Sequence, residues 1–246
     1  MPSNPSDWIR QVDLDYHERQ FREPYRSTVA FCDWIESLSL IDNASRIEVL
    51  DVACGLGGNI AYMAKRYPQC SFTGIDINDQ LVQAGNRIFE SAGIENCRLK
   101  TADLYRLNEN FAGKFDAVIS FQTLSWLPDF EAPLQSLCKL DAKWIALTSL
   151  FYDGPLSCKI EVQDYDPDFN PTEISFYNVY SLPLVEKRLE SLGYSQISNT
   201  PFEIDIDLNP PADQGKGTYT KRLENGRRLQ FSGPLHLPWK FIAASQ

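Results

Sequence analysis

The stretch that decides the fold is Ile47-Glu-Val-Leu-Asp-Val-Ala53, a β-branched apolar run that leads directly into Cys54-Gly-Leu-Gly-Gly58. Such a run predicts a buried strand, and the helical spacing of apolar residues over 59–67 predicts that a helix follows. The glycines allow the backbone to approach a ligand closely, where a Cβ atom would clash. This order predicts a ligand site at the carboxyl end of the first strand of an open α/β sheet.

Strand and helix patterns continue to alternate along the chain. Further short strands are expected at 71–76, 98–102, 115–121 and 143–150. Helical spacing begins at Asp79 and again at Glu131, and an amphipathic helix is expected near residues 24–38. Alternation with short turns predicts an α/β fold, with a mostly parallel sheet covered by helices on both faces.

The pattern changes after residue 150. Residues 151–180 are rich in Asp, Pro and aromatic side chains and lack a helical period, and a helix then begins at the N-cap Ser181. Strict alternation of apolar and acidic residues predicts a half-exposed strand over 202–208. A hairpin turning at Glu224-Asn-Gly226 is expected over 219–231, and a last strand over 239–245.

Charge and cysteine usage limit the partners and the compartment. The 246 residues carry 23 Lys and Arg against 33 Asp and Glu, for a net charge of −10. This charge disfavours nucleic acids and anionic membranes as partners. No apolar stretch is long enough to span a bilayer, and no apolar signal region is visible at the start, so a cytoplasmic location is expected. The six cysteines lack a CxxC pair and are interpreted as reduced thiols, and with only two histidines no metal site is expected.

The acidic residues around the glycine loop bear on the choice of cofactor. Asp76 lies 21 residues after Gly55, at the end of the second predicted strand, where a carboxylate can accept both hydroxyls of a ribose. The dinucleotide fingerprint G-x-G-x-x-G is incomplete, because Ala53 stands two residues before Gly55 and no glycine stands three residues after Gly57. Asp51 would repel a pyrophosphate but suits a ligand with an amino group and a sulfonium.

Residues 49–58 resemble the first motif of class I S-adenosylmethionine-dependent methyltransferases, and the resemblance covers about residues 45–150. It includes Asp76, the segment 101–104, the strand 115–122 and the segment 124–129. It implies a Rossmann-like, seven-stranded sheet with S-adenosyl-L-methionine as cofactor. The cofactor-binding residues implied are Asp51, Ala53, Gly55, Gly57, Asp76, Ile77, Asp103, Leu104, Ser120 and Phe121. Ala53 departs from the glycine that is commonest at its position.

The same resemblance organises the rest of the chain. We expect a single domain over 1–246, with an N-terminal helical cover at 1–40, a cofactor-binding half at 45–150 and a substrate-side half at 151–246. Inserts at 151–180 and 209–235 complete a small substrate cover. In similar methyltransferases the N-terminal segment folds over the cofactor, which makes Tyr16 and Arg26 candidates to cap its carboxylate; packing and surface positions are the alternative for both.

Residues for the acceptor are less defined. An oxygen acceptor needs a base, and the candidates are His17, Asp129, Asp153, Tyr177 and His236. Trp126 is a candidate substrate-binding residue, and the alternative for it is a position in the core or the pocket wall. Five basic residues fall within 216–228, and the hairpin pattern puts Arg222 and Arg228 on one polar face, which suits a phosphate or carboxylate. The alternative is that these arginines pair with Glu203, Asp205 and Asp207, or face solvent.

The expected activity is methyl transfer to oxygen or nitrogen of a small molecule, with an anionic or sugar-linked intermediate as the candidate acceptor. Three alternatives stay open. One is an inactive methyltransferase-like binding module, and another is an NAD-dependent dehydrogenase, against which the missing third glycine counts. The third is a related fold that uses the cofactor for cyclisation or decarboxylation. No pattern in the sequence indicates an oligomeric state.

Overall fold

The computed structural model describes residues 19–107, 111–212 and 215–246. By internal contacts the chain forms two compact units. The first comprises residues 1–121, 132–146 and 245–246, and the second comprises 122–131 and 147–244. The division expected from the sequence, a single domain with halves at 45–150 and 151–246, stays a prediction.

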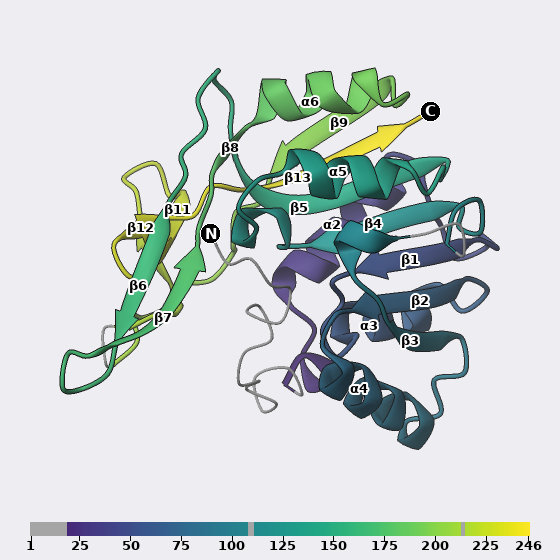
Figure 1. Ribbon diagram of the computed structural model, residues 1–246, viewed down its shortest axis with the longest axis horizontal. Coiled ribbons are helices and arrows are strands. Elements are labelled where there is room, and N and C mark those ends of the chain that lie inside the picture. The colour runs from purple at the N-terminus through teal and green to yellow at the C-terminus, as the bar shows by residue number, and fades with distance from the viewer. Residues whose placement is uncertain (1–18, 108–110, 213–214) are drawn as a thin grey trace. The chain divides into compact units, whose positions relative to one another are not determined.

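Four parallel strands build the first unit (Figure 1). They are β1 (Glu48–Val52), β2 (Ser71–Asp76), β3 (Cys97–Thr101) and β4 (Ala117–Phe121). β1 lies between β2 and β4, with Asp51 opposite Gly74 on one side and Ile119 on the other. This pairing brings the carboxyl ends of three strands to one edge of the sheet, where the glycine loop begins.

Helices of the first unit follow the predicted apolar spacing. They are α2 (Arg26–Ser37), α3 (Gly58–Arg66), α4 (Asp79–Ser91) and α5 (Glu131–Cys138), with the 3-10 turn η2 (Leu104–Arg106). Both α3 and α4 pack against β2 and β3. Asn78 caps α4 by accepting hydrogen bonds from the backbone N–H groups of Gln80 and Leu81 at 3.0 and 3.4 Å. On α4 the buried residues recur with helical period, which explains why the helix forms here.

The strand order of the main sheet is β3-β2-β1-β4-β5-β13-β9, and β8 pairs with β5 as an eighth strand. The later strands are β5 (Trp144–Tyr152), β8 (Tyr180–Ser181), β9 (Gln196–Pro201) and β13 (Trp239–Ser245). The predicted mostly parallel α/β sheet flanked by helices is confirmed. The short β8 makes the count eight in place of the expected seven.

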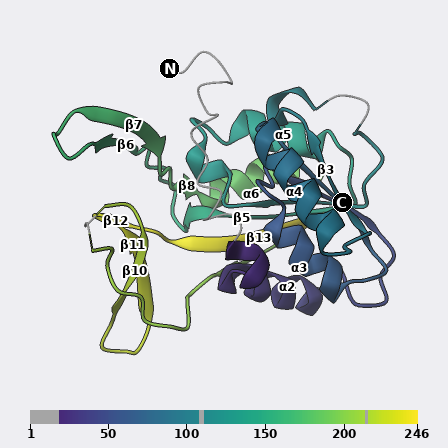
Figure 2. The same cartoon turned by 90° about the horizontal axis from the view of Figure 1, so that it is seen from below.

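Two small sheets complete the second unit, and Figure 2 shows them as separate projections. One is the hairpin of β6 (Glu161–Tyr165) and β7 (Pro171–Phe176), and the other consists of β10 (Thr218–Arg222), β11 (Arg228–Ser232) and β12 (Leu235–His236). The unit also holds the 3-10 turn η3 (Leu124–Trp126) and α6 (Leu182–Ser191), capped by Ser181. Leu150, Tyr177, Leu237 and Trp239 form one buried apolar cluster of this unit.

One expectation for the second unit is corrected and one is confirmed. Residues 202–208 form no strand, because β9 ends at Pro201 and only the N–H of Phe202 continues the ladder, donating to the carbonyl of Trp239 at 2.9 Å. The segment 151–180, which lacks a helical period, contains the β6–β7 hairpin. The hairpin over 219–231 forms as predicted, and its three-residue turn closes with the N–H of Leu223 donating to the carbonyl of Arg227 at 2.8 Å.

All six cysteines are free thiols. Cys32, Cys54, Cys70 and Cys138 are buried, Cys97 is half-buried and Cys158 is exposed. Burial raises the pKa of Cys32 and of Cys97 to about 12 and also raises that of Cys70. Among the described residues, no helix is both long and apolar enough to cross a bilayer.

Candidate functional site

Asp51 lies inside β1 with none of its surface exposed. Neither of its carboxylate oxygens has a hydrogen-bond partner among the described residues. Burial, and then the charge of Asp76, raise the pKa of this carboxyl well above its usual value. A buried carboxylate without a partner is costly, so its position at the ligand edge of the sheet favours a ligand that brings a positive charge or N–H donors.

The loop after β1 has a strained backbone that is held in place by hydrogen bonds. Ala53 and Gly57 take left-handed φ angles of 61° and 80°. The N–H of Gly57 donates to the carbonyl of Cys54 at 2.9 Å, and the N–H of Cys54 donates to the carbonyl of Ile75 at 3.0 Å. The left-handed angle at exposed Ala53 explains why glycine suits that position. Gly55 is buried in the same loop.

Gly57 has a packing role beneath this loop. It is the residue before α3, and an added Cβ would lie 2.7 Å from Cζ of Phe89 and 3.0 Å from Cδ2 of Leu99. Both side chains belong to the core of the first unit, so they leave no room for a larger residue. The glycine is therefore required by the contact between the loop and the elements below it.

Asp76, the last residue of β2, fastens the loop to the neighbouring strand. Its Oδ2 accepts from the N–H of Gly55 at 2.8 Å, and its Oδ1 accepts from the N–H of Asn78 at 2.9 Å. A carboxylate has about four lone-pair positions and can accept from several donors at once. The half-buried Ile77 stands beside it.

The remaining predicted cofactor residues of the first unit also lie at strand ends. Asp103 caps η2, since its Oδ1 accepts from the N–H of Tyr105 at 2.9 Å, and the following Leu104 is half-buried. Ser120 donates through Oγ to the carbonyl of Val52 at 2.8 Å, which ties β4 to β1. The Phe121 ring meets that of Phe31 edge-on, with centroids 4.7 Å apart.

The N-terminal candidates are only partly described. Tyr16 and His17 lie outside the described residues. Arg26 is exposed at the first position of α2. Two residues further on, Oγ1 of Thr28 donates to Oδ1 of Asn59 at 2.7 Å, which joins α2 to the first turn of α3 next to the glycine loop.

Of the candidates for a base in the second unit, Asp153 and His236 line the same cavity, and Asp129 and Tyr177 are not part of its lining. Tyr177 is buried with its ring 4.5 Å from that of Trp126, and its hydroxyl lies 3.5 Å from Oγ of Ser232. Asp129 is half-buried, and Asp153 pairs with Lys240. His236 is exposed on β12, although partial burial of its ring lowers its pKa. Trp126 packs against the apolar cluster of this unit.

The basic hairpin makes the ion pairs that were the alternative to anion binding. Arg222 and Arg228 face each other across β10 and β11, as the sequence predicts. Nε of Arg228 lies 2.7 Å from Oδ1 of Asp207, and Arg227 pairs with Glu203.

The predictions from the sequence did not include a cavity of about 250 Å³ in the second unit, lined in part by Gln230, Trp239 and Lys240. A usable signal was present in the last strand. Lys240 is the one charged residue of Trp239–Ser245, where the other residues are apolar or small. A lysine within a buried strand needs a partner or a solvent-filled space beside it.

Comparison with known proteins finds similarity to methyltransferases. Residues 43–153 match the family model of a methyltransferase domain. Trans-aconitate 2-methyltransferase from Deinococcus radiodurans is 33% identical over 92 residues, which are 37% of this chain and 32% of that protein. Malonyl-[acyl-carrier protein] O-methyltransferase from Acetivibrio thermocellus is 30% identical over 97 residues, or 39% of this chain and 32% of that protein. The matched segment thus spans about a third of these relatives.

The fold itself has solved counterparts. The YcgJ protein from Bacillus subtilis superposes with a TM-score of 0.56 over 90% of this chain and 99% of that structure, at 13% sequence identity. At this identity the likeness concerns the fold, and it extends beyond the segment matched by sequence.

Proposed function

We propose, because residues 43–153 match the family model of a methyltransferase domain, that this chain is an S-adenosylmethionine-dependent methyltransferase. The proposal takes the edge formed by the carboxyl ends of β1, β2 and β4 as the cofactor site. When bound, S-adenosylmethionine supplies a methyl group on a positively charged sulfur.

The observation that carries the proposal is the buried carboxylate of Asp51, which lacks a partner among the described residues. An amino-acid ammonium group would satisfy it, whereas the pyrophosphate of a dinucleotide would meet a like charge. Asp76, whose Oδ2 holds the loop through the N–H of Gly55, is the carboxylate that would accept hydrogen bonds from the ribose hydroxyls. The residues present therefore fit the cofactor. By the resemblance described above, Asp103 and Leu104 would hold the adenine base, and Ser120 and Phe121 would hold the part that carries the sulfur.

The acceptor that we propose is a small molecule, methylated on oxygen or nitrogen. The net charge of −10 supports a small molecule over a nucleic acid. The names of the two relatives described above specify small organic acids or their carrier-bound forms. An anion held by Arg228 would have to displace Asp207, so that arginine gives the anionic acceptor little support. The six free thiols support a cytoplasmic location.

The test is calorimetric titration with S-adenosylmethionine, S-adenosylhomocysteine and NAD. We expect the first two to bind, and Asp76→Ala to weaken their binding at least tenfold, because charge-assisted hydrogen bonds contribute about 1.5–3 kcal/mol each. Asp168→Ala, which removes an exposed acid of the second unit, serves as the control and should leave binding unchanged. Tight NAD binding without a response to either methionine derivative would overturn the proposal.

A further inference from the structure

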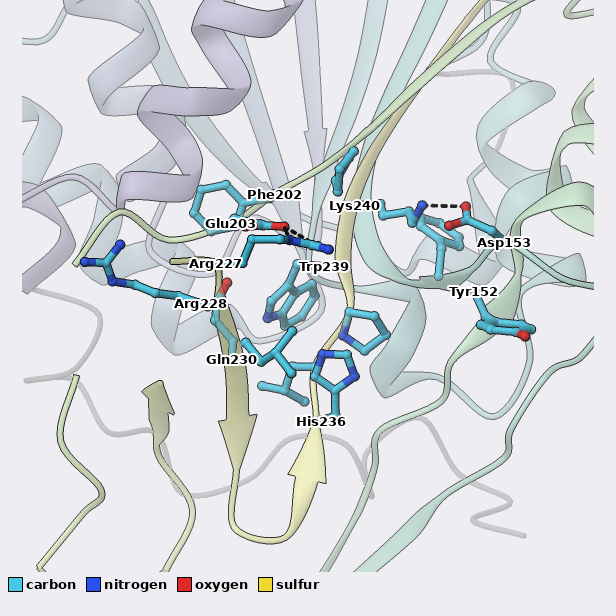
Figure 3. A pocket seen from close by; sticks show the side chains of 15 residues that line it. Tyr152, Asp153, Phe202, Glu203, Arg227, Arg228, Gln230, His236, Trp239 and Lys240 are labelled. Atoms are coloured by element: carbon cyan, nitrogen blue, oxygen red, sulfur yellow. Dashed lines mark hydrogen bonds and ion pairs between the residues drawn. The ribbon is translucent and has the colours of Figure 1, made fainter. Parts of the chain in front are cut away.

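The cavity of the second unit, here called the hairpin pocket, contains none of the residues assigned to the cofactor (Figure 3). It has a volume of about 250 Å³. Its walls come from residues 151–153 at the end of β5, 201–203 after β9, 227–230 around β11 and 236–240 leading into β13. These stretches converge from four parts of the sequence, so the pocket is a product of the fold rather than of one loop.

The charges of the hairpin pocket are already balanced by the protein. Figure 3 draws Arg227 paired with Glu203 and Lys240 paired with Asp153. The third cation, Arg228, pairs with Asp207. Each cation therefore has a carboxylate in place, and an anionic ligand would have to displace one of them. A neutral ligand meets no such competition.

One polar group of the pocket is left without a partner. The Gln230 side chain is buried at 7% exposure, and its Oε1 accepts no hydrogen bond among the described residues. A buried amide oxygen in this state favours a ligand that donates a hydroxyl or N–H hydrogen. A carboxylate or phosphate oxygen is itself an acceptor, so it would repel this amide oxygen instead of bonding to it. The imidazole of His236, kept neutral at pH 7 by its lowered pKa, offers one further donor and one further acceptor.

The rest of the lining is apolar, and the space is small. Phe202, Leu237 and Trp239 supply hydrocarbon and aromatic surface. A volume of about 250 Å³ lies below the roughly 300–1,000 Å³ typical of sites for drug-sized ligands. The pocket thus combines an apolar wall, the acceptor Oε1 of Gln230, unpaired among the described residues, and ion-paired charges in a small space.

We propose that the hairpin pocket binds a neutral, hydroxyl-bearing ring of about the size of one sugar. Such a ring has C–H faces that suit the aromatic wall. Its hydroxyl groups can donate to Oε1 of Gln230, and they can donate to or accept from His236 and the ion-paired side chains of the pocket. The proposal goes beyond methyl transfer, since it concerns binding whether or not the ring is itself methylated.

The test compares methyl β-glucopyranoside with the anion of methyl β-glucuronide, here called the glucuronate, which carries a carboxylate in place of the C6 hydroxymethyl group. Binding to the 246-residue chain is followed by NMR without S-adenosylmethionine, through the indole N–H signal of Trp239, which is assigned with Trp239→Phe. We expect the glucoside to shift this signal in a saturable way and the glucuronate to bind more weakly. Gln230→Leu should weaken glucoside binding about tenfold, and Gln80→Leu, on the exposed face of α4, is the matched control.

Three outcomes would overturn the proposal: no saturation by the glucoside up to 50 mM, tighter binding of glucuronate, or unchanged binding by a folded Gln230→Leu protein. If Gln230→Leu fails to fold, His236→Ala, at an exposed residue of the same pocket, replaces it and should weaken binding severalfold. Because no cofactor is present, the result is independent of whether the chain transfers methyl groups.

Discussion

The buried carboxyl group of Asp51 lowers the stability of the ligand-free protein, and in our proposal the same group binds the ammonium group of the cofactor. Replacing Asp51 with Asn removes an ionisable group whose charged form is disfavoured by burial. We expect the thermal midpoint of the free Asp51→Asn protein at pH 7 to rise by roughly 2–4 °C for each kcal/mol gained. The affinity for S-adenosylmethionine should fall at least tenfold, since the ammonium group loses its counter-charge. Differential scanning calorimetry and titration calorimetry measure the two effects.

The stability difference between the parent protein and Asp51→Asn should depend on pH in a defined direction. The pKa of Asp51 is raised by folding, so the native protein holds a proton that the unfolded chain releases. The contribution of Asp51 to stability is therefore greatest below the unfolded pKa of about 3.9 and is lost as pH rises through the folded value. The difference in midpoint between Asp51→Asn and the parent should narrow as pH falls from 7 toward 4. A lower midpoint for Asp51→Asn at pH 7 would contradict this account.

At the scale of elements, α4 supports the glycine loop through one close contact. A Cβ added at Gly85 of α4 would lie 2.4 Å from the carbonyl oxygen of Leu56 in that loop. Because the obstacle is backbone, Gly85→Ala must push the helix and the loop apart. We expect a loss of about 1–3 kcal/mol of unfolding free energy, measured by denaturant titration, together with weaker cofactor binding. Glu90→Ala on the exposed face of α4 is the control, and equal stability of the two variants would remove this role from Gly85.

The elements of the first unit were predictable because each follows from a local pattern. The run 47–53 and the period of α4 specify a strand and a helix without reference to distant residues. The second unit was harder, because its small sheets depend on partners far along the chain. Residues 202–208 have the alternation of a strand, but their polar positions serve another purpose: Glu203 and Asp207 reach Arg227 and Arg228.

Predictability of the site follows the same division. The edge around Asp51 and Asp76 was predictable, because it is built from consecutive motifs in one sheet. The hairpin pocket was not predictable, because Gln230 and Lys240 line a common cavity only after β11 and β13 are brought together with the ends of β5 and β9. Alternation within a strand indicates which residues share a face, and it gives no information on what that face meets.

At the scale of the whole molecule, charge decides which partners can approach. The net charge is −10, and three residues of the basic hairpin region, Lys216, Arg227 and Arg228, are paired with acidic side chains. We expect the protein to bind a fluorescent 20-nucleotide RNA at 0.15 M salt no more tightly than about 100 μM, the weak end of nonspecific binding. Fluorescence anisotropy at two salt concentrations measures this. Submicromolar binding that weakens steeply with salt would instead indicate a nucleic-acid acceptor.

The distribution of the thiols makes this chain convenient for site-specific labelling. Maleimide reagents attack the thiolate form of a cysteine that they can reach. Burial holds Cys32, Cys54, Cys70 and Cys138 away from such reagents, and the raised pKa of half-buried Cys97 suppresses its thiolate. Cys158 alone is exposed among the six. A single fluorophore or spin label can therefore be attached to the unaltered protein at a known position of the second unit, as an optical or magnetic reporter of ligand binding.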